Sequence, residues 1–190
     1  MKLGNVAATA WYPGTQIAQL SSARSTTFTV NGSVDYGWRY HIFGYINPST
    51  DGAVDRTMRL QPNSDANAAY ANDQHQHYKN ADGSNAHVTG NLAPADANGL
   101  VVASTGWGVG GTVIAWGTFY GLNGYGVGRP YEGRCTTRPD TAGDSRTLAN
   151  DYAGYWSHTT QATVVTSLWF QMGGTAAHFT GTIRIQAIVQ

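Results

Sequence analysis

Apolar residues alternate with polar residues along several short segments of the chain. The clearest case is residues 180–190, TGTIRIQAIVQ, where apolar side chains fall on one face and polar ones on the other. A period of two predicts a strand with one buried face. Residues 163–172 alternate in the same way, and the segment GGTAAHF that follows them suits a hairpin connection. The end of the chain is therefore expected to form two antiparallel strands.

Five further segments predict strands. Residues 36–46 carry apolar or aromatic side chains on both faces, so we expect both faces to be covered in part. Residues 25–30 precede Asn31-Gly32, the dipeptide that most strongly indicates a tight hairpin turn. The other three strand segments are residues 56–60, 100–104 and 112–120.

No segment shows the period of an amphipathic helix, and residues 65–71, DANAAYA, are expected to form one short helical turn at most. About eight short strands with polar connections predict an all-β fold, an antiparallel β-sandwich of the jelly-roll type. No repeat of 20–50 residues is visible, which disfavours propellers and solenoids. Because no linker is apparent, we expect residues 1–190 to form a single domain.

Composition agrees with this fold and limits the partners. Charged residues make up 12% of the chain, roughly half the usual share of about 25%, which is untypical of helical proteins. The formal net charge is zero and no basic run exists, so nucleic acid is not an expected partner. No secretory or membrane-spanning segment is apparent, so we expect synthesis in a cytoplasm and no membrane contact. Cys135, the single cysteine, is expected to be a buried free thiol.

Motifs for enzymatic chemistry fail their own requirements. Residues 106–111, GWGVGG, lack the Lys-Ser/Thr of a phosphate-binding loop and have no βαβ context. Residues 143–145, GDS, suit a hydrolase nucleophile, but neither His158 nor His178 follows an Asp at the required spacing. Glu132 is the only glutamate and most aspartates lie in turn sequences, so a glycosidase carboxylate pair is not indicated. We expect no enzymatic activity.

The segment DQHQH places Asp73, His75 and His77 two residues apart, so on a strand they would share one face. Two imidazoles per chain are too few for a good metal site in a monomer, and no Glu follows as a cupin would require. Three copies of His75 and His77 at a threefold axis would supply six nitrogens, an octahedral set for a transition metal. Metal binding is thus conditional on three copies, and we expect residues 71–80 to form a polar surface loop that binds no metal. No other cofactor is expected.

Most of the aromatic residues in the second half of the chain are expected to lie in the core. Tyr125 and Tyr131 occur in Gly-rich segments that predict turns, so they are the candidates for exposed aromatic side chains. An exposed aromatic ring beside Asn, Asp or Arg suits a sugar or a partner subunit, because it offers a flat apolar face with a polar tip.

Two parts of the chain, residues 56–71 and 156–190, resemble jelly-roll domains in virion proteins of tailed bacteriophages. The resemblance covers residues 56–190, with residues 1–55 as additional N-terminal strands. It rests on a strand leading into an Asn-x-Asp turn and a Tyr, and on a closing pair of strands with a glycine turn. The matching residues are Arg59-Leu60, Asn63, Asp65 and Tyr70, then Thr166-Ser167-Leu168, Gly173-Gly174 and Phe179 through Ile183.

The resemblance implies a structural protein on the virion surface, in a tail fibre or receptor-binding role that contacts host surface glycans. It also implies contacts with other virion subunits and a homo-oligomer, with a trimer favoured. Phage fibres hold metal with His-x-His at threefold axes, which is similar to the pattern of His75 and His77. One alternative is a capsid decoration or head-fibre protein that contacts capsid subunits. Another is a carbohydrate-active enzyme or a free lectin-like module.

Overall fold

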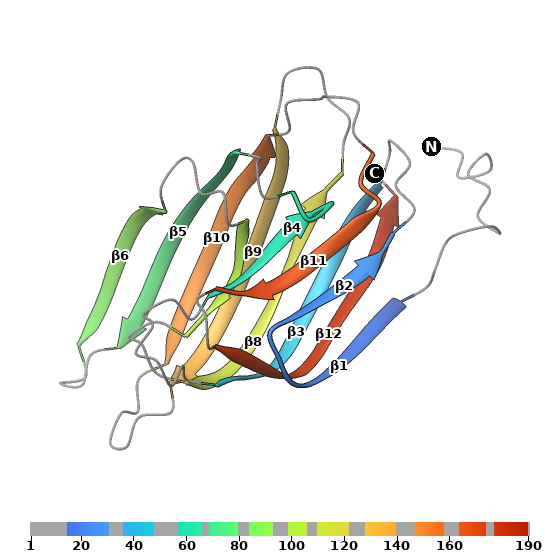
Figure 1. Ribbon diagram of the computed structural model, residues 1–190. Helices are drawn as coiled ribbons and strands as arrows, with labels where there is room; N and C mark the ends of the chain where they lie inside the picture. Colours follow the sequence, from blue (N-terminus) through green and yellow to red (C-terminus); the bar gives the residue numbers. More distant parts are fainter. Residues whose placement is uncertain are drawn as a thin grey trace.

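The computed structural model describes residues 15–30, 36–47, 57–65, 69–79, 84–92, 99–105, 110–121, 128–139, 147–157, 164–173 and 177–189 (Figure 1). Within these ranges the chain forms twelve strands and no helix. The strands are β1 (Thr15–Ala23), β2 (Ser25–Thr29), β3 (Tyr36–Asn47), β4 (Thr57–Pro62), β5 (Ala69–Lys79), β6 (Asn85–Leu92), β7 (Leu100–Ser104), β8 (Gly111–Tyr120), β9 (Arg129–Pro139), β10 (Leu148–Ser157), β11 (Ser167–Met172) and β12 (His178–Val189).

Two antiparallel sheets face each other, as Figure 1 shows. The large sheet has eight strands in the order β1-β12-β3-β8-β9-β10-β5-β6, and the small sheet has four in the order β2-β11-β4-β7. The predicted all-β antiparallel sandwich is therefore confirmed. The described residues form twelve strands where about eight were expected.

The strand order explains the difference in number. Eight strands form a frame in the order β1-β12-β3-β8 and β2-β11-β4-β7, and the chain changes sheet from each of them to the next except from β4 to β7, as in a jelly roll. The other four are two hairpins, β5-β6 and β9-β10, each inserted between strands of that frame. Both hairpins join the large sheet beyond β8 and widen it from four strands to eight.

Both predicted hairpins are wrong, because the frame sends the chain to the opposite sheet at each of these connections. β11 pairs with β2 and β4, whereas β12 pairs with β1 and β3. β2 likewise lies in the small sheet and β3 in the large sheet, while Asn31 and Gly32 fall outside the described residues. The helical turn predicted for residues 65–71 is also wrong at its end, since Ala69 begins β5.

The hydrophobic core lies between the sheets and draws on both the N-terminal and C-terminal parts of the chain. It includes Trp38 and Phe119 stacked at 6.0 Å and Phe28 packed edge-on against Phe170 at 5.8 Å. Cys135 is fully buried in this core, as expected, and burial raises the pKa of its thiol.

No helix in the described part of the chain is long and apolar enough to cross a membrane.

The inner face of the large sheet makes room for a buried tyrosine. Gly117 and Gly133 lie opposite each other on β8 and β9, and Gly117 is also opposite Tyr40 on β3. A Cβ at either glycine would collide with the Tyr40 hydroxyl, so the ring occupies the space that two side chains would otherwise fill. The Tyr40 hydroxyl donates to the Tyr131 hydroxyl at 3.4 Å, and the Tyr131 hydroxyl donates to the Val101 carbonyl.

Polar side chains on this inner face hold the edge strand β7 of the small sheet. The Asn72 amide donates to the Gly99 carbonyl at 3.1 Å and accepts from the Val101 N–H at 2.9 Å. Thr137 donates to the Ser104 carbonyl at 2.7 Å. These bonds satisfy backbone groups of β7 that no further strand pairs with, and so they fix the two sheets against each other.

Candidate interaction surface

The outer face of the large sheet carries two rows of residues that lie directly opposite one another from strand to strand. We call them the Trp116 row and the Glu132 row. The Trp116 row runs through Arg184, His41, Trp116, Arg134, Asp151 and His75, on β12, β3, β8, β9, β10 and β5. The Glu132 row is its neighbour two residues along each strand and runs through Gln186, Arg39, Thr118, Glu132, Ala153 and Asp73.

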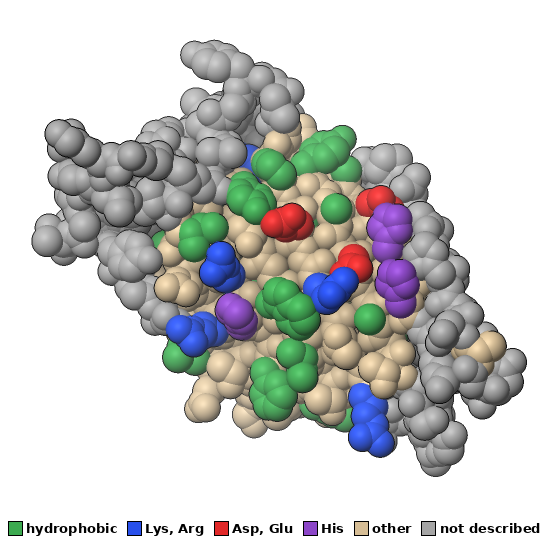
Figure 2. All heavy atoms as spheres, turned by 180° about the vertical axis from the view of Figure 1, so that it is seen from behind, with side chains coloured by type: hydrophobic (Ala, Val, Ile, Leu, Met, Phe, Trp, Pro, Cys, Tyr) green, Lys and Arg blue, Asp and Glu red, His purple; other side chains and the backbone are tan. Residues whose placement is uncertain are grey.

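Apolar side chains are exposed in the middle of this face. Phe43, Ile114 and Trp116 are 62%, 46% and 42% exposed, and they lie on the neighbouring strands β3 and β8. Figure 2 shows this face, with hydrophobic side chains at its centre and others toward its edges. Part of this exposure contradicts the expectation from the sequence, which had both faces of residues 36–46 partly covered. Large contiguous exposed apolar areas are uncommon on monomers, so these side chains make this face the candidate interaction surface.

One side of the face is rich in carboxylates. Asp151 accepts two hydrogen bonds from the Arg134 guanidinium, at 2.5 Å from Nε and 3.0 Å from Nη2. These bonds hold the pKa of Asp151 below its ordinary value and raise that of Arg134. His77 Nε2 lies 4.0 Å from Asp151, and His75 Nε2 lies 3.4 Å from Asp73. Each of these two histidines of β5 therefore lies close to a carboxylate, His75 to one on its own strand and His77 to one on β10.

The other side of the face is basic. Arg39, His41 and Arg184 project from the adjacent strands β3 and β12 and are all exposed. Burial lowers the pKa of His41, and the positive charges of Arg184 and Arg39 lower it further. Positive charge is therefore concentrated at this part of the surface. In Figure 2 most basic side chains lie on one side of the face and the acidic ones toward the other, with one basic side chain directly beside an acidic one.

The predicted polar loop at residues 71–80 is wrong, because Ala69–Lys79 is a strand. Asp73, His75 and His77 consequently share the outer face of the sheet, as their spacing allows. Within the described residues, no group of three or more His, Cys, Asp or Glu converges closely enough to hold a metal ion. Metal binding by His75 and His77 at a threefold axis requires further copies of the chain, so it stays a prediction.

The two candidate tyrosines differ. Tyr125 lies outside the described residues. Tyr131 is 2% exposed and lies in the strand β9, so the expectation that it is an exposed turn residue is wrong. Its ring stacks on Tyr40 at 6.3 Å, and burial raises the pKa of its hydroxyl well above the ordinary value. Tyr131 is part of the inner face and has no free surface for a ligand.

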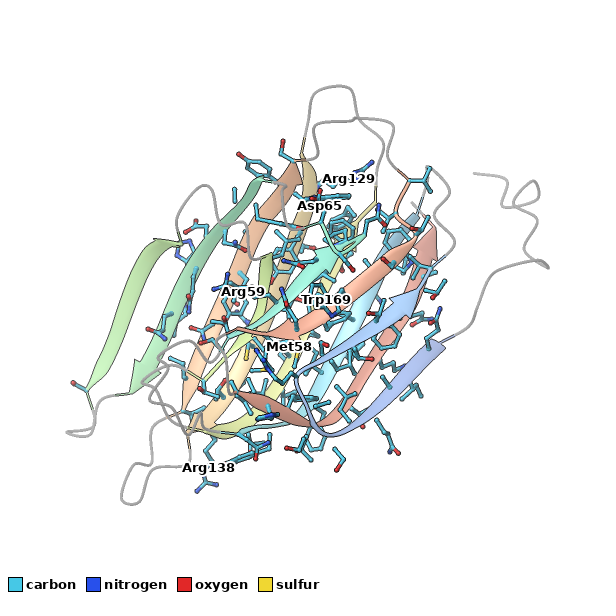
Figure 3. All side chains as sticks on the ribbon, in the orientation of Figure 1. Met58, Arg59, Asp65, Arg129, Arg138 and Trp169 are labelled. Atoms are coloured by element: carbon cyan, nitrogen blue, oxygen red, sulfur yellow. The ribbon has the colours of Figure 1, made fainter. Side chains whose placement is uncertain are left out.

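A second polar cluster lies at one end of the sandwich. The Arg129 guanidinium stacks over the Trp156 ring at 4.7 Å, and the Trp156 indole N–H donates to Asp65 at 3.3 Å. Figure 3 shows Arg129 and Asp65 near each other at this end, whereas Arg138 lies at the opposite end of β9. Arg129 is only 4% exposed, so this cluster joins the turn after β4 to the large sheet instead of presenting a binding surface.

Comparison with known proteins identifies no family. No protein-family model matches the chain, and no curated protein matches it. Among solved structures, the chain is similar to one described as the structure of infectious bursal disease virus Gt strain, with a TM-score of 0.17 and 10% identity. That match covers 93% of this chain and 40% of the viral chain, so this chain spans less than half of it. A similarity of this size carries no inference about function.

The exposed apolar centre of the outer face was not predicted from the sequence. Trp116 and Ile114 alternate with buried Val113 and Ala115 along β8, and both faces of that strand read as apolar in the sequence. Nothing in the local pattern distinguishes the face toward the core from the face toward solvent. The register between β3, β8 and β9 provides that distinction, and it depends on the whole topology.

Proposed function

We propose that this chain is a non-enzymatic structural protein of a tailed-bacteriophage virion that works through contacts with other protein subunits. The observation that carries the proposal is the apolar centre of the outer face, formed by Phe43, Ile114 and Trp116. Ile114 offers a sugar neither hydrogen bonds nor an aromatic face, and Phe43 lacks a polar tip, whereas both suit the desolvated centre of a protein interface. The jelly-roll frame and the resemblance of residues 56–190 to phage virion domains support the assignment to a virion.

The test is incorporation into particles. We expect mass spectrometry of particles purified from a lysate of a phage encoding this chain to contain it in stoichiometric amount. The variant Phe43→Ser/Ile114→Ser should fold but be absent from the particles, because its interface has lost its apolar centre. Val164→Ser is the matched control, since Val164 is 38% exposed but lies before β11, outside the large sheet. Absence of the wild-type chain from purified particles would refute the proposal.

A receptor-binding role toward host glycans is the second candidate. It is favoured by the Trp116 ring beside the hydrogen-bonded pair of Arg134 and Asp151, since stacking next to fixed polar groups is how flat sites hold sugars. In that case glycan-array binding should disappear in Trp116→Ala and persist in Phe43→Ser. Binding that survives Trp116→Ala would assign the glycan to another surface.

A further inference from the structure

We propose that the partner of the outer face is a second copy of this chain, bound face to face about a two-fold axis. This inference rests on the proposed function, because it assumes that the outer face contacts another protein subunit. It adds the identity of the partner, the symmetry and the pairing of charges. The rows, the charge distribution and the dimensions of the sheet each support it.

Charge is separated along the rows. Arg39 and Arg184 stand on β3 and β12, one in each row. The carboxylates of both rows stand on the other half of the sheet. They are Glu132 on β9, Asp151 on β10 and Asp73 on β5. With histidines neutral, the β3–β12 half carries two positive charges. The β9–β5 half carries three negative charges and the positive charges of Arg134 and Arg138 among its described side chains, a net of minus one.

Only one orientation of a two-fold axis makes this pattern complementary to itself. An axis parallel to the strands, passing between β8 and β9, keeps each row at its own height and exchanges the two halves. The arginines of one copy then face the carboxylate half of the other within the same rows. An axis perpendicular to the strands would place like charges together. Isologous contacts of the first kind are the usual form of homodimers, and complementary potentials favour them.

The same axis buries the part of the apolar centre that lies on β8, while Phe43 on β3 comes to lie opposite Ala149 on β10 of the other copy. Trp116 and Arg134 are neighbours on β8 and β9, on either side of the axis, so Trp116 of each copy faces Arg134 of the other. A guanidinium over an indole ring is a favourable cation–π contact. Ile114 lies two residues from Trp116 on β8, so the same contact buries it near the axis. Within the rows, Arg39 of one copy lies opposite Ala153, between Glu132 and Asp73 of the other, and Arg184 lies opposite His75, beside Asp151. The interface would thus have an apolar core, with the arginines of each copy set among the carboxylates of the other toward its rim.

The sheet is large enough for such a contact. Eight strands spaced ~4.8 Å apart, with the ten residues of β8 rising ~3.4 Å each, give a face of roughly 35 by 34 Å. This corresponds to roughly 1,200 Å², more than the roughly 800 Å² per partner of a standard interface. Twisted sheets stack face to face with their strands about 30° apart, so the twist does not prevent the contact.

A complementary pair of charge variants tests the proposal. In Arg39→Glu/Arg184→Glu both halves are negative, and in Asp73→Lys/Glu132→Lys both are positive. Each variant alone should be monomeric, with self-association weakened roughly 100-fold or more, because like charges meet across the axis. An equimolar mixture of the two should form a dimer again. Masses are measured by sedimentation equilibrium at low and high salt, and wild-type association should weaken as salt rises.

Arg24→Glu/Thr27→Glu is the control variant. Both of its substitutions lie at exposed positions around β2, away from the outer face, so it should dimerise as wild type does. Thermal unfolding of every variant establishes that loss of the dimer is not loss of the fold.

Several results would overturn the proposal. They are a wild-type monomer at high micromolar concentration, an oligomer that all charge variants share, or a mixture that stays monomeric. Two further outcomes distinguish this inference from the proposed function. A monomeric wild type whose incorporation into particles still depends on Phe43 and Ile114 would keep the virion role and assign the face to a different subunit. A dimer that never occurs in particles would keep the present inference and refute the virion role.

Discussion

The two faces of the eight-stranded sheet are built from the same strands and differ in almost every other respect. On the inner face, the Tyr40 ring fills the space above Gly117 and Gly133, and Asn72 and Tyr131 bond to the backbone of β7. On the outer face, apolar side chains stand exposed among ion pairs in contact with solvent. The inner face therefore determines stability. The outer face is available for a partner, since changes there disturb little of the fold.

The largest expected effect is alkaline unfolding driven by the inner face. Burial raises the pKa of Tyr40, Tyr131 and Tyr152 above the ordinary value of 10.0, and burial also raises that of Tyr70 at the end of the sandwich. A raised pKa in the folded state means that the stabilisation is complete below pH 10 and is lost as the pH rises above it. Each unit above pH 10 lowers the free energy of unfolding by about 1.4 kcal/mol per buried tyrosine.

At pH 11 the three inner-face tyrosines together should lower the free energy of unfolding by about 4 kcal/mol. Urea titrations at stepped pH, followed by tyrosinate absorbance, measure the loss. Tyr152→Phe should reduce the measured pH dependence by about one quarter, because Tyr70 contributes as well. A free energy of unfolding that stays constant up to pH 11 would mean that water reaches these hydroxyls, and the contrast between the faces would fail.

Asn72→Ala should lower the free energy of unfolding by about 3 kcal/mol. The substitution leaves the Gly99 carbonyl and the Val101 N–H buried without partners, and each such group costs roughly 1–3 kcal/mol. Gln76 lies four residues further along β5, on the same inner face. Gln76→Ala should change the free energy of unfolding by less than about 0.5 kcal/mol. Equal effects of the two substitutions would show that the bonds to β7 contribute little.

Gly133→Ala should cost about 2 kcal/mol, since the new methyl group meets the Tyr40 hydroxyl in a packed interior. The collision at Gly133 is mainly with that hydroxyl, so Tyr40→Phe in the same chain should recover much of the loss. A double-mutant cycle measures the coupling between the two sites. Thr136→Ala, on the outer face of the same strand, is the control and should cost less than about 1 kcal/mol. Strictly additive effects would contradict the packing described for Tyr40.

The smallest effect is expected on the outer face itself. Asp151→Asn removes the charge that pairs with Arg134, and exposed pairs contribute at most about 1 kcal/mol. The pKa of Asp151 is lowered in the folded state, so this contribution is present above the ordinary carboxyl pKa and lost as the pH falls through the folded value. Urea titrations of both proteins should therefore differ slightly at neutral pH and coincide in acid. A loss of several kcal/mol would make the outer face part of the stable framework.

The strands found from the sequence belong to the jelly-roll frame, and those missed belong mainly to the added hairpins. β12, β3 and β8 were recognised because each covers the core with Ile, Trp or Val at every second position. In β9 the inward positions are Tyr131, Gly133, Cys135 and Thr137, which follow no apolar period because a tyrosine from another strand fills the space. β5 likewise turns Asn72 and Gln74 inward. Such patterns indicate turns or loops when they are read locally.

The candidate surface was harder to predict than the fold. His75 and His77 were visible as a pair with one face, because their spacing alone determines that property. Their neighbours Asp151 and Arg134 lie about 60 to 75 positions further along the chain and meet them only through the strand order β9-β10-β5. That order follows from two insertions in separate parts of the frame, and no local pattern encodes it.

The two inserted hairpins supply one half of the outer face, and the jelly-roll frame supplies the other half. Its basic half stands on β3 and β12, which the jelly-roll frame needs, whereas its acidic half stands on β9, β10 and β5, which the frame does not need for closure. Specificity at this face is consequently modular. Redesigning only the outward positions of the added hairpins would change the partner, while their inward residues Asn72, Tyr131 and Thr137 kept holding β7.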